Sequence, residues 1–443
     1  MKTFTSPLGK FCTSVACLFL GSSSALLASD LVLQKVPPLT IEQAPAYPEN
    51  VARQALGAKV EAATAVSNLQ VTSTSGAAPE AALLCGDPTA GYTLPAGVTT
   101  LLVSLPKIEN VETISFLNTA AKGDVTVSTA SAKLPADSPQ WHVVSKEEIN
   151  GNAVKAKIGP SEAKYVKLTF NVKESGRIAA FGVYASPAVS DFTMPRQRQL
   201  PSADQPLTFA MVNYNMSNVH TKARALYVSS GADMKQANSM IDDQPSTSYT
   251  FAAGDGSPTT VIDLGQVRTL NRVSAIYAAN KGSMDVYVLP AIPGAGDDAA
   301  PASLPNTVKI SEQTIAAMKP VASATDDGAQ GRASVNFAAT TGRYVMLRWN
   351  PAIQQDGAFT VAEVAAFGGN TDDQVVATKR RHNDVSDGKT VADSKDMADA
   401  KDMADVPAEG PGEEAAPPAE GPPPSLPQPP PFTFIPQVLP NSP

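Results

Sequence analysis

Few residues in this chain have the types and spacing that catalysis requires. The three histidines, His142, His220 and His382, lie far apart. No His-Glu-x-x-His, Walker loop, Gly-x-Ser-x-Gly or Cys-x-x-Cys motif occurs. Adjacent acids are explained by solvated turns, since neighbouring positions in a loop do not imply a shared site; they are Asp297-Asp298, Asp326-Asp327 and Asp372-Asp373. The sequence therefore predicts a protein that is not an enzyme.

A few aromatic and polar residues are candidates for ligand binding. A carbohydrate site usually needs an aromatic face with polar side chains beside it. Only two tryptophans exist, Trp141 and Trp349, and the second precedes an Asn-Pro pair at the predicted end of a strand. Tyr277, Asn280 and Lys281 gather at another predicted strand end. We take Tyr277, Asn280, Lys281 and Trp349 as candidate ligand-binding residues, with ordinary core or surface positions as the alternative.

The N-terminus has the pattern of a secretory signal. Lys2 and Lys10 supply positive charge, and Phe11–Leu27 is mostly apolar and interrupted by small residues. We expect a signal peptide over residues 1–28 and an exported protein (periplasmic, cell-surface or secreted), with an uncleaved anchor as the alternative. No later segment is apolar enough to predict a transmembrane span. Cys85 is the only cysteine beyond the signal, so no intrachain disulfide is expected.

An internal repeat determines the elements that must position these residues. Tyr92 aligns with Tyr249, and Leu102–Gly123 aligns without a gap with Val261–Gly282. Short runs rich in Val, Ile, Thr and Tyr alternate with turn residues in both copies, which predicts an all-β protein. The predicted strands of the first copy are Val71–Thr74, Thr99–Leu105, Thr113–Leu117, Val125–Val127 and Tyr165–Val172. Those of the second are Phe209–Val212, Ala225–Val228, Thr260–Leu264, Val273–Tyr277, Asp285–Leu289, Ser334–Phe337 and Tyr344–Trp349.

The copies define the predicted domains. They span residues 66–186 and 207–369, and a proline-containing linker over residues 187–206 joins them. Residues 29–65 are expected to form an extended leader with a short helix in its Ala-rich half. The tail over residues 370–443 is acidic, repetitive and Pro-rich, a composition that predicts disorder. Its apolar end, Phe432–Leu439, could bind a protein partner or be an unstructured terminus.

Four elements of the second copy, in order, resemble the discoidin family, also called coagulation factor 5/8 type C domains, within the galactose-binding-like group. They are the turn Asp242–Tyr249, the strand end Asp263–Gly265, the strand Arg343–Arg348 and the last strand Ala362–Gly368. The first copy is linked to the family only by its alignment with the second copy. The resemblance implies two tandem jelly-roll β-sandwiches.

The resemblance also implies a ligand and a structural ion. Family members bind carbohydrate, phospholipid head groups or protein surfaces through loops at one end, and a calcium ion often ties the Asp-containing turn to the last strand. Asp242, Thr247 and Glu363 match its ligands, while Gln244 stands where the family often has an acid. Alternatively, Asp242 and Thr247 only cap a turn through side-chain-to-backbone bonds.

The first copy lacks these oxygen ligands. Cys85 aligns with Asp242 and Ala90 with Thr247. Ala180 aligns with Glu363 if Tyr184 is matched with Phe367; the other alignment of the endings matches Ala179–Gly182 with Ala365–Gly368. We therefore expect the first copy to bind no calcium and to serve as a scaffold.

Net charge excludes some partners. The formal charge is -8, and most of it lies in the tail, so the repeat is nearly neutral. A nucleic-acid-binding face is not indicated, and the membrane-binding version of the family is disfavoured. We expect binding of a glycan or another cell-surface component through the second copy. The alternative is a structural or adaptor protein of the cell envelope that uses its sandwiches and tail for protein contacts.

Overall fold

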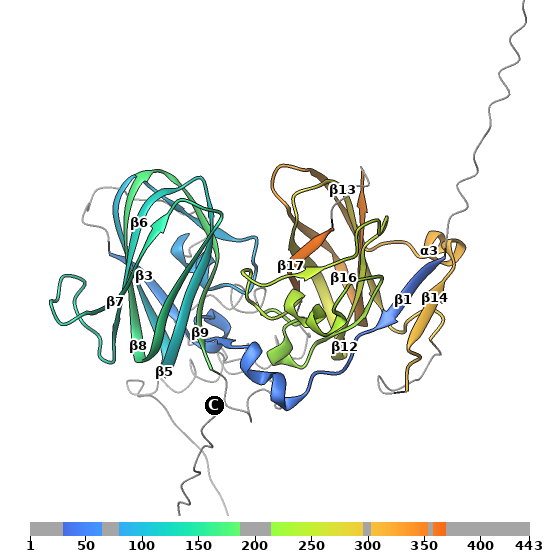
Figure 1. The fold of residues 1–443 in the computed structure, drawn as a ribbon, viewed down its shortest axis with the longest axis horizontal. Coiled ribbons are helices and arrows are strands. Elements are labelled where there is room, and N and C mark those ends of the chain that lie inside the picture. The colour runs from blue at the N-terminus through green and yellow to red at the C-terminus, as the bar shows by residue number, and fades with distance from the viewer. Residues whose placement is uncertain (1–29, 64–78, 187–213, 296–302, 353–357, 369–443) are drawn as a thin grey trace, which may run out of the picture. The chain divides into compact units, whose positions relative to one another are not determined.

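The computed structural model describes residues 30–63, 79–186, 214–295, 303–352 and 358–368. They form two antiparallel β-sheet bodies, shown in Figure 1, with few and short helices. This confirms the predicted all-β class. None of the helices among these residues is long and apolar enough to cross a membrane.

The first sandwich has eight strands and the order β2-β9-β5-β8-β6-β7, with β3 beside β5 and β4 beside β9. Its strands are β2 (Glu49–Asn50), β3 (Lys59–Ala63), β4 (Gly91–Leu94), β5 (Gly97–Thr119), β6 (Lys122–Ala130), β7 (His142–Ile149), β8 (Ala153–Glu174) and β9 (Gly176–Ala185). Two 3-10 helices, η2 (Gln54–Leu56) and η3 (Pro79–Leu84), precede β4.

Two long strands give the first sandwich its layers. The ladder between β5 and β8 is interrupted between Ser104 and Glu109. On one side of the interruption β8 also pairs with β6, and on the other side β5 also pairs with β9. Leu101 and Val103 before the interruption share one core with Ile114 and Phe116 after it. Buried residues alternate with partly exposed ones from Thr99 to Leu105, as expected for strands with one face in a core.

The second sandwich repeats this pairing pattern with added strands. Its strands are β1 (Leu31–Lys35), β10 (Arg224–Val228), β11 (Tyr249–Thr250), β12 (Thr259–Tyr277), β13 (Lys281–Leu289), β14 (Thr307–Ile310), β15 (Ala322–Asp327), β16 (Arg332–Pro351) and β17 (Thr360–Phe367). Its helices are η1 (Ile41–Ala46), η4 (Val219–Thr221), η5 (Met234–Met240) and α3 (Glu312–Ala317).

The strand pairings show that the repeat extends to topology. Strand β12 pairs with β10, β16 and β17, just as β5 pairs with β3, β8 and β9. Likewise β13 lies between β16 and β15, as β6 lies between β8 and β7. The additions to the second body are β1, which pairs with β10, and β14, which pairs with β1 (Figure 1).

The segment expected to be a leader differs from the prediction. Strand β1 belongs to the second sandwich, and Val36, Ala44 and Tyr47 lie in the second core. The chain then crosses to the first sandwich, where β3 is the repeat equivalent of β10. The first copy therefore begins before residue 66. The expected helix is only the short η2, because the Ala-rich segment from Lys59 pairs with β5 instead.

Several predicted features lie outside the described residues. They are the signal peptide over 1–28, the strands Val71–Thr74 and Phe209–Val212, the linker over 187–206, and the tail over 370–443.

The burial of β1 predicts a strong and face-specific effect of mutation. Leu33 is fully buried in the second body, whereas its neighbour Val32 is 38% exposed. We expect Leu33→Ala to lower the free energy of unfolding by about 2–5 kcal/mol, because it removes buried methyl groups and leaves a cavity. Val32→Ala, the matched control on the other face, should cost less than about 1 kcal/mol. Chemical denaturation of the full chain measures both; equal losses would contradict the placement of β1.

Candidate functional site

The turn after η5 holds the first candidate ligand. Asp242 is 1% exposed, and its carboxylate accepts hydrogen bonds from Thr247 Oγ1 at 2.8 and 3.0 Å. It also accepts one from the main-chain N–H of Gln244 at 3.0 Å. Thr247 Oγ1 also lies 2.8 Å from the Gln244 carbonyl, so its single proton is shared between that carbonyl and the carboxylate. Asp242 and Thr247 thus cap the turn that leads into β11, which is one of the two roles considered for them.

Glu363 brings a second buried carboxylate to this turn from β17. It is 1% exposed, and neither carboxylate oxygen has a hydrogen-bond partner of ordinary geometry among the described residues. Burial raises the pKa of Glu363 well above its usual value, and the nearby charges of Asp242 and Asp243 raise it further. The pKa of Asp242 is raised as well, mainly by burial, while the Thr247 and Gln244 bonds oppose the shift.

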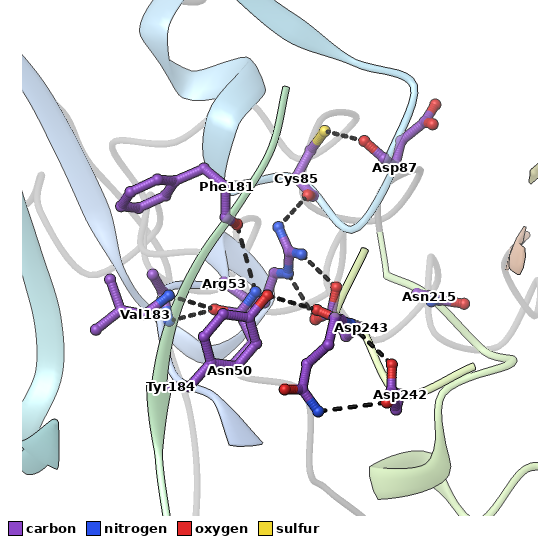
Figure 2. A network of polar contacts seen from close by, with 12 residues as sticks. Asn50, Arg53, Cys85, Asp87, Phe181, Val183, Tyr184, Asn215, Asp242 and Asp243 are labelled. Atoms are coloured by element: carbon purple, nitrogen blue, oxygen red, sulfur yellow. Dashed lines mark hydrogen bonds and ion pairs between the residues drawn. The ribbon is translucent and has the colours of Figure 1, made fainter. Parts of the chain in front are cut away.

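Arg53 supplies positive charge to the same region from the segment after β2. Figure 2 shows its guanidinium against Asp243 and the Cys85 carbonyl. Nε donates to Asp243 Oδ2 at 2.8 Å, Nη2 bonds Asp243 Oδ1, and Nη1 donates to the Cys85 carbonyl at 2.7 Å. Asp243 has a left-handed backbone (φ 61°), and Tyr184 donates to its carbonyl at 2.9 Å. The turn is therefore held by groups of the first sandwich.

Charge in this cluster is not balanced by the described residues when every acid is ionised. Asp242, Asp243 and Glu363 are buried, and Arg53 is the buried cation that the structure places against them. Isolated ions are costly to bury, so the excess negative charge must be met by protons or by a cation. The unpartnered oxygens of Glu363 and the oxygens of Asp242 and Thr247 are hard ligands of the kind that calcium prefers. The residues present fit a calcium ion in chemistry, although the described residues contain no preformed cluster of three acidic, His or Cys ligands.

The first sandwich caps the equivalent turn differently. Cys85 is buried with its thiol donating to the Ala82 carbonyl at 3.0 Å, and burial raises the pKa of the thiol to about 11. Asp87, which aligns with Gln244, accepts from the N–H and hydroxyl of Thr89 at 2.9 and 2.7 Å. Arg272 of the second sandwich pairs with the other Asp87 oxygen. The sequence alignment did not identify Asp87 as an acid of this turn, because it compared only the three positions that match the calcium ligands.

Two candidate ligand-binding aromatics lie in the core. Trp349 is 2% exposed and Tyr277 is 8% exposed. Their ring centroids are 6.2 Å apart, and Phe359 lies 5.7 Å from Trp349 and 5.9 Å from Tyr277. Trp349 therefore cannot offer a ring face to a ligand, contrary to its candidacy. Of the other two candidates, which follow Tyr277 closely in the sequence, Asn280 is partly exposed and Lys281 is exposed.

A polar cavity of about 550 Å³ lies at one end of the second sandwich, where β10 ends and β12 begins. The Asp255 carboxylate accepts from Ser229 at 2.6 Å, from Ser230, and from the Ser257 N–H at 3.0 Å. Arg348 donates to Glu312 at 3.0 Å and to Ser257 at 3.2 Å, while its buried Nε has no partner among the described residues. Leu31 and Val32 of β1 add an apolar wall. No motif in the sequence brings these residues together.

Comparison with known proteins gives only distant matches. No family model matches the sequence, and no curated protein matches it. A serum fucolectin from Morone saxatilis is 14% identical over 73% of this chain and 99% of its own, with a TM-score of 0.26. Allantoicase from Saccharomyces cerevisiae is 11% identical over 74% of this chain and 95% of its own, with a TM-score of 0.26.

A GH29 fucosidase from Ruminococcus gnavus, solved with fucose, is 16% identical over 37% of this chain, with a TM-score of 0.27. This chain covers 28% of the length of that fucosidase. At these TM-scores the matches establish neither a shared fold nor a shared ligand.

The buried contact of Arg53 predicts a large cost of truncation. Arg53→Met should lower the free energy of unfolding by about 3–5 kcal/mol, because it leaves the buried Asp243 without its cation. Lys122→Met, which breaks the exposed pair between Lys122 and Glu174, should cost less than about 1 kcal/mol. Denaturation of both variants measures this difference.

A double-mutant cycle of Arg53→Met with Asp243→Asn isolates the interaction itself. We expect a coupling energy above about 1 kcal/mol. Additive effects would show that the two side chains do not act on each other.

Proposed function

We propose that this chain is an exported, non-catalytic carbohydrate-binding protein whose glycan occupies the polar cavity of the second sandwich. The observation that carries the proposal is the set of polar groups held around that cavity, above all Asp255 and Arg348. Its volume lies within the range of small-ligand sites, about 300–1,000 Å³.

The chemistry of the cavity suits sugar hydroxyls. A hydroxyl both donates and accepts, so it is best matched by carboxylates next to guanidinium and hydroxyl groups. Asp255 is oriented by two serine hydroxyls, and Arg348 is oriented by Glu312, which reduces the entropy lost when a ligand binds. None of the described residues that line the cavity is aromatic. Hydrogen bonding and the apolar wall of β1 would therefore provide the affinity.

We further propose that Asp242, Thr247 and Glu363 hold a structural calcium ion in the second sandwich. The ion would supply the positive charge that Arg53 alone does not provide, and it would tie the capped turn to β17. The buried and unpartnered carboxylate of Glu363 supports this proposal.

Glycan binding is tested with the full chain, because β1 forms part of the cavity. We expect specific glycans to be retained on an array, and Arg348→Gln to weaken their binding by about tenfold or more, as for a lost charged hydrogen bond. Titration calorimetry with the best glycan measures the loss.

Arg343→Gln is the matched control on the same strand. Arg343 pairs with Asp263 at 2.9 and 3.0 Å and does not line the cavity, so glycan affinity should not change. An array without hits would contradict carbohydrate binding, whereas hits that both variants retain equally would contradict only this site.

Calcium binding predicts a metal-dependent melting temperature that requires Glu363. The wild-type chain should melt at a higher temperature in calcium chloride than in chelator. Glu363→Gln should abolish that difference and should melt above the wild type in chelator, because the amide is neutral, whereas the buried carboxyl must either keep its charge or take up a proton on folding. Glu174→Gln, at an exposed pair, is the control and should keep the calcium response. A wild-type melting temperature that calcium does not change would overturn the proposed ion.

A further inference from the structure

The charged residues that line the polar cavity of the second sandwich are mostly acidic. They are Asp30, Asp255, Glu312 and Arg348. Three formal negative charges thus meet one positive charge around a space that is large enough for a small ligand. A neutral glycan would use the hydrogen-bonding groups of this cavity, but it would leave the excess of negative charge without a counterpart.

Hydrogen bonds join three of these charged groups into one chain. The Asp255 carboxylate accepts from the Ser257 N–H at 3.0 Å, and the Ser257 hydroxyl accepts from Arg348 at 3.2 Å. Arg348 also donates to one oxygen of Glu312 at 3.0 Å, and this ion pair matches its charge. The partners of Asp255 among the described residues are neutral, two serine hydroxyls and the main-chain N–H. Its negative charge is therefore still available to a ligand.

Asp30 adds a further negative charge at the same end of the sandwich. Leu31 pairs with Ile310 in the antiparallel ladder between β1 and β14. Asp30 comes one residue before this pair and Glu312 two residues after it, so both follow the same end of the ladder. Asp30 is exposed, whereas Asp255 is partly buried. Because solvent screens charges, Asp255 should attract a cation more strongly than Asp30 does.

We propose that this cavity selects a sugar that carries a protonated amine. The inference rests on the proposed glycan function and names the class of sugar. An ammonium group has three hydrogen-bond donors and no acceptor, so it suits the free lone pairs of Asp255 and Glu312. Arg348 Nε, which is buried without a partner among the described residues, would donate to a hydroxyl oxygen of the same sugar.

The same charges disfavour an acidic sugar. Its carboxylate would bring a like charge to Asp255 and Asp30, and it would have to compete with Glu312 for Arg348. Repulsion of this kind contributes to specificity as much as attraction does. The charge of the lining therefore predicts an order of affinity in which cationic sugars bind most tightly and anionic sugars most weakly.

Titration of the full chain with glucosamine, glucose and glucuronate tests this order, at constant ionic strength and at a pH that keeps the amine protonated. The three sugars share a ring and differ in charge. We expect glucosamine to bind about tenfold or more tightly than glucose, as for one hydrogen bond between charged groups, and glucuronate to bind more weakly than glucose.

Equal affinities for glucosamine and glucose, or no binding of glucosamine, would overturn this inference. If a glycan array still gave hits, the proposed glycan function would stand without it, whereas an array without hits would overturn both. Methylammonium that binds as tightly as glucosamine would show a simple cation site, which would also overturn the inference.

Variants assign the preference to the cavity. Asp255→Asn keeps an oxygen for the Ser257 N–H, and it should reduce the preference for glucosamine over glucose by about tenfold. Asp30→Asn, at an exposed position, should reduce it by less than about fivefold. Asp327→Asn is the control, because it removes an exposed acid of β15 that does not line the cavity. A loss with Asp327→Asn equal to that with Asp255→Asn would show that only net charge matters and would overturn the assignment.

Discussion

The structure depends most on one buried ion pair, between Arg53 and Asp243. A buried guanidinium is tolerated only when its donors are met, and here Asp243 and the Cys85 carbonyl meet them. The pair joins a segment of the first sandwich to the turn of the second that carries Asp242. A reciprocal pair joins Arg272 of the second sandwich to Asp87 in the equivalent turn of the first. Each copy therefore supplies the cation that the acidic turn of the other requires.

The two turns differ in the charge that remains after these ion pairs have formed. In the second copy, Arg53 compensates Asp243, and the charges of Asp242 and Glu363 remain. In the first copy, Asp87 is compensated by Arg272, and Cys85 adds no charge while its thiol stays protonated. The difference in local charge is the physical basis for proposing a cation in one turn and not in the other.

Much of the fold could be predicted from local patterns, because alternation of apolar residues marks half-buried strands. The aligned run from Leu102 to Gly123 corresponds to β5 and the start of β6, and its partner run corresponds to β12 and the start of β13. The pairing of β1 could not be predicted, because its partners β10 and β14 are distant in sequence and no local sequence pattern identifies them. The residue types and the apolar alternation of its five residues are those of any short strand.

Prediction of the sites failed for a related reason. Trp349 has the residue type that stacks on sugars, but Tyr277 of β12 and Phe359 of the loop before β17 pack around it and place it inside. Arg53 belongs to no motif, and its importance follows from Asp243, which the fold places opposite it. Asp242, Thr247 and Glu363 could be named together as candidates because a family resemblance supplied the long-range information that spacing lacks. The structure places Asp242 beside Thr247, and it places Glu363 within the electrostatic reach of Asp242.

The position of β1 also bears on how the chain assembles. It is synthesised before every other strand described, yet it pairs with residues up to Val228 and Ile310. Loop closure over such distances is slow, so the pairing of β1 is a folding step of high contact order, with a longer sequence separation than the β2–β9 pairing of the first sandwich. Until β14 has been made, the apolar residues Leu31 and Leu33 have no permanent cover. A nascent chain would thus expose an unpaired and apolar strand for most of its synthesis, which is where a chaperone would bind or aggregation would begin.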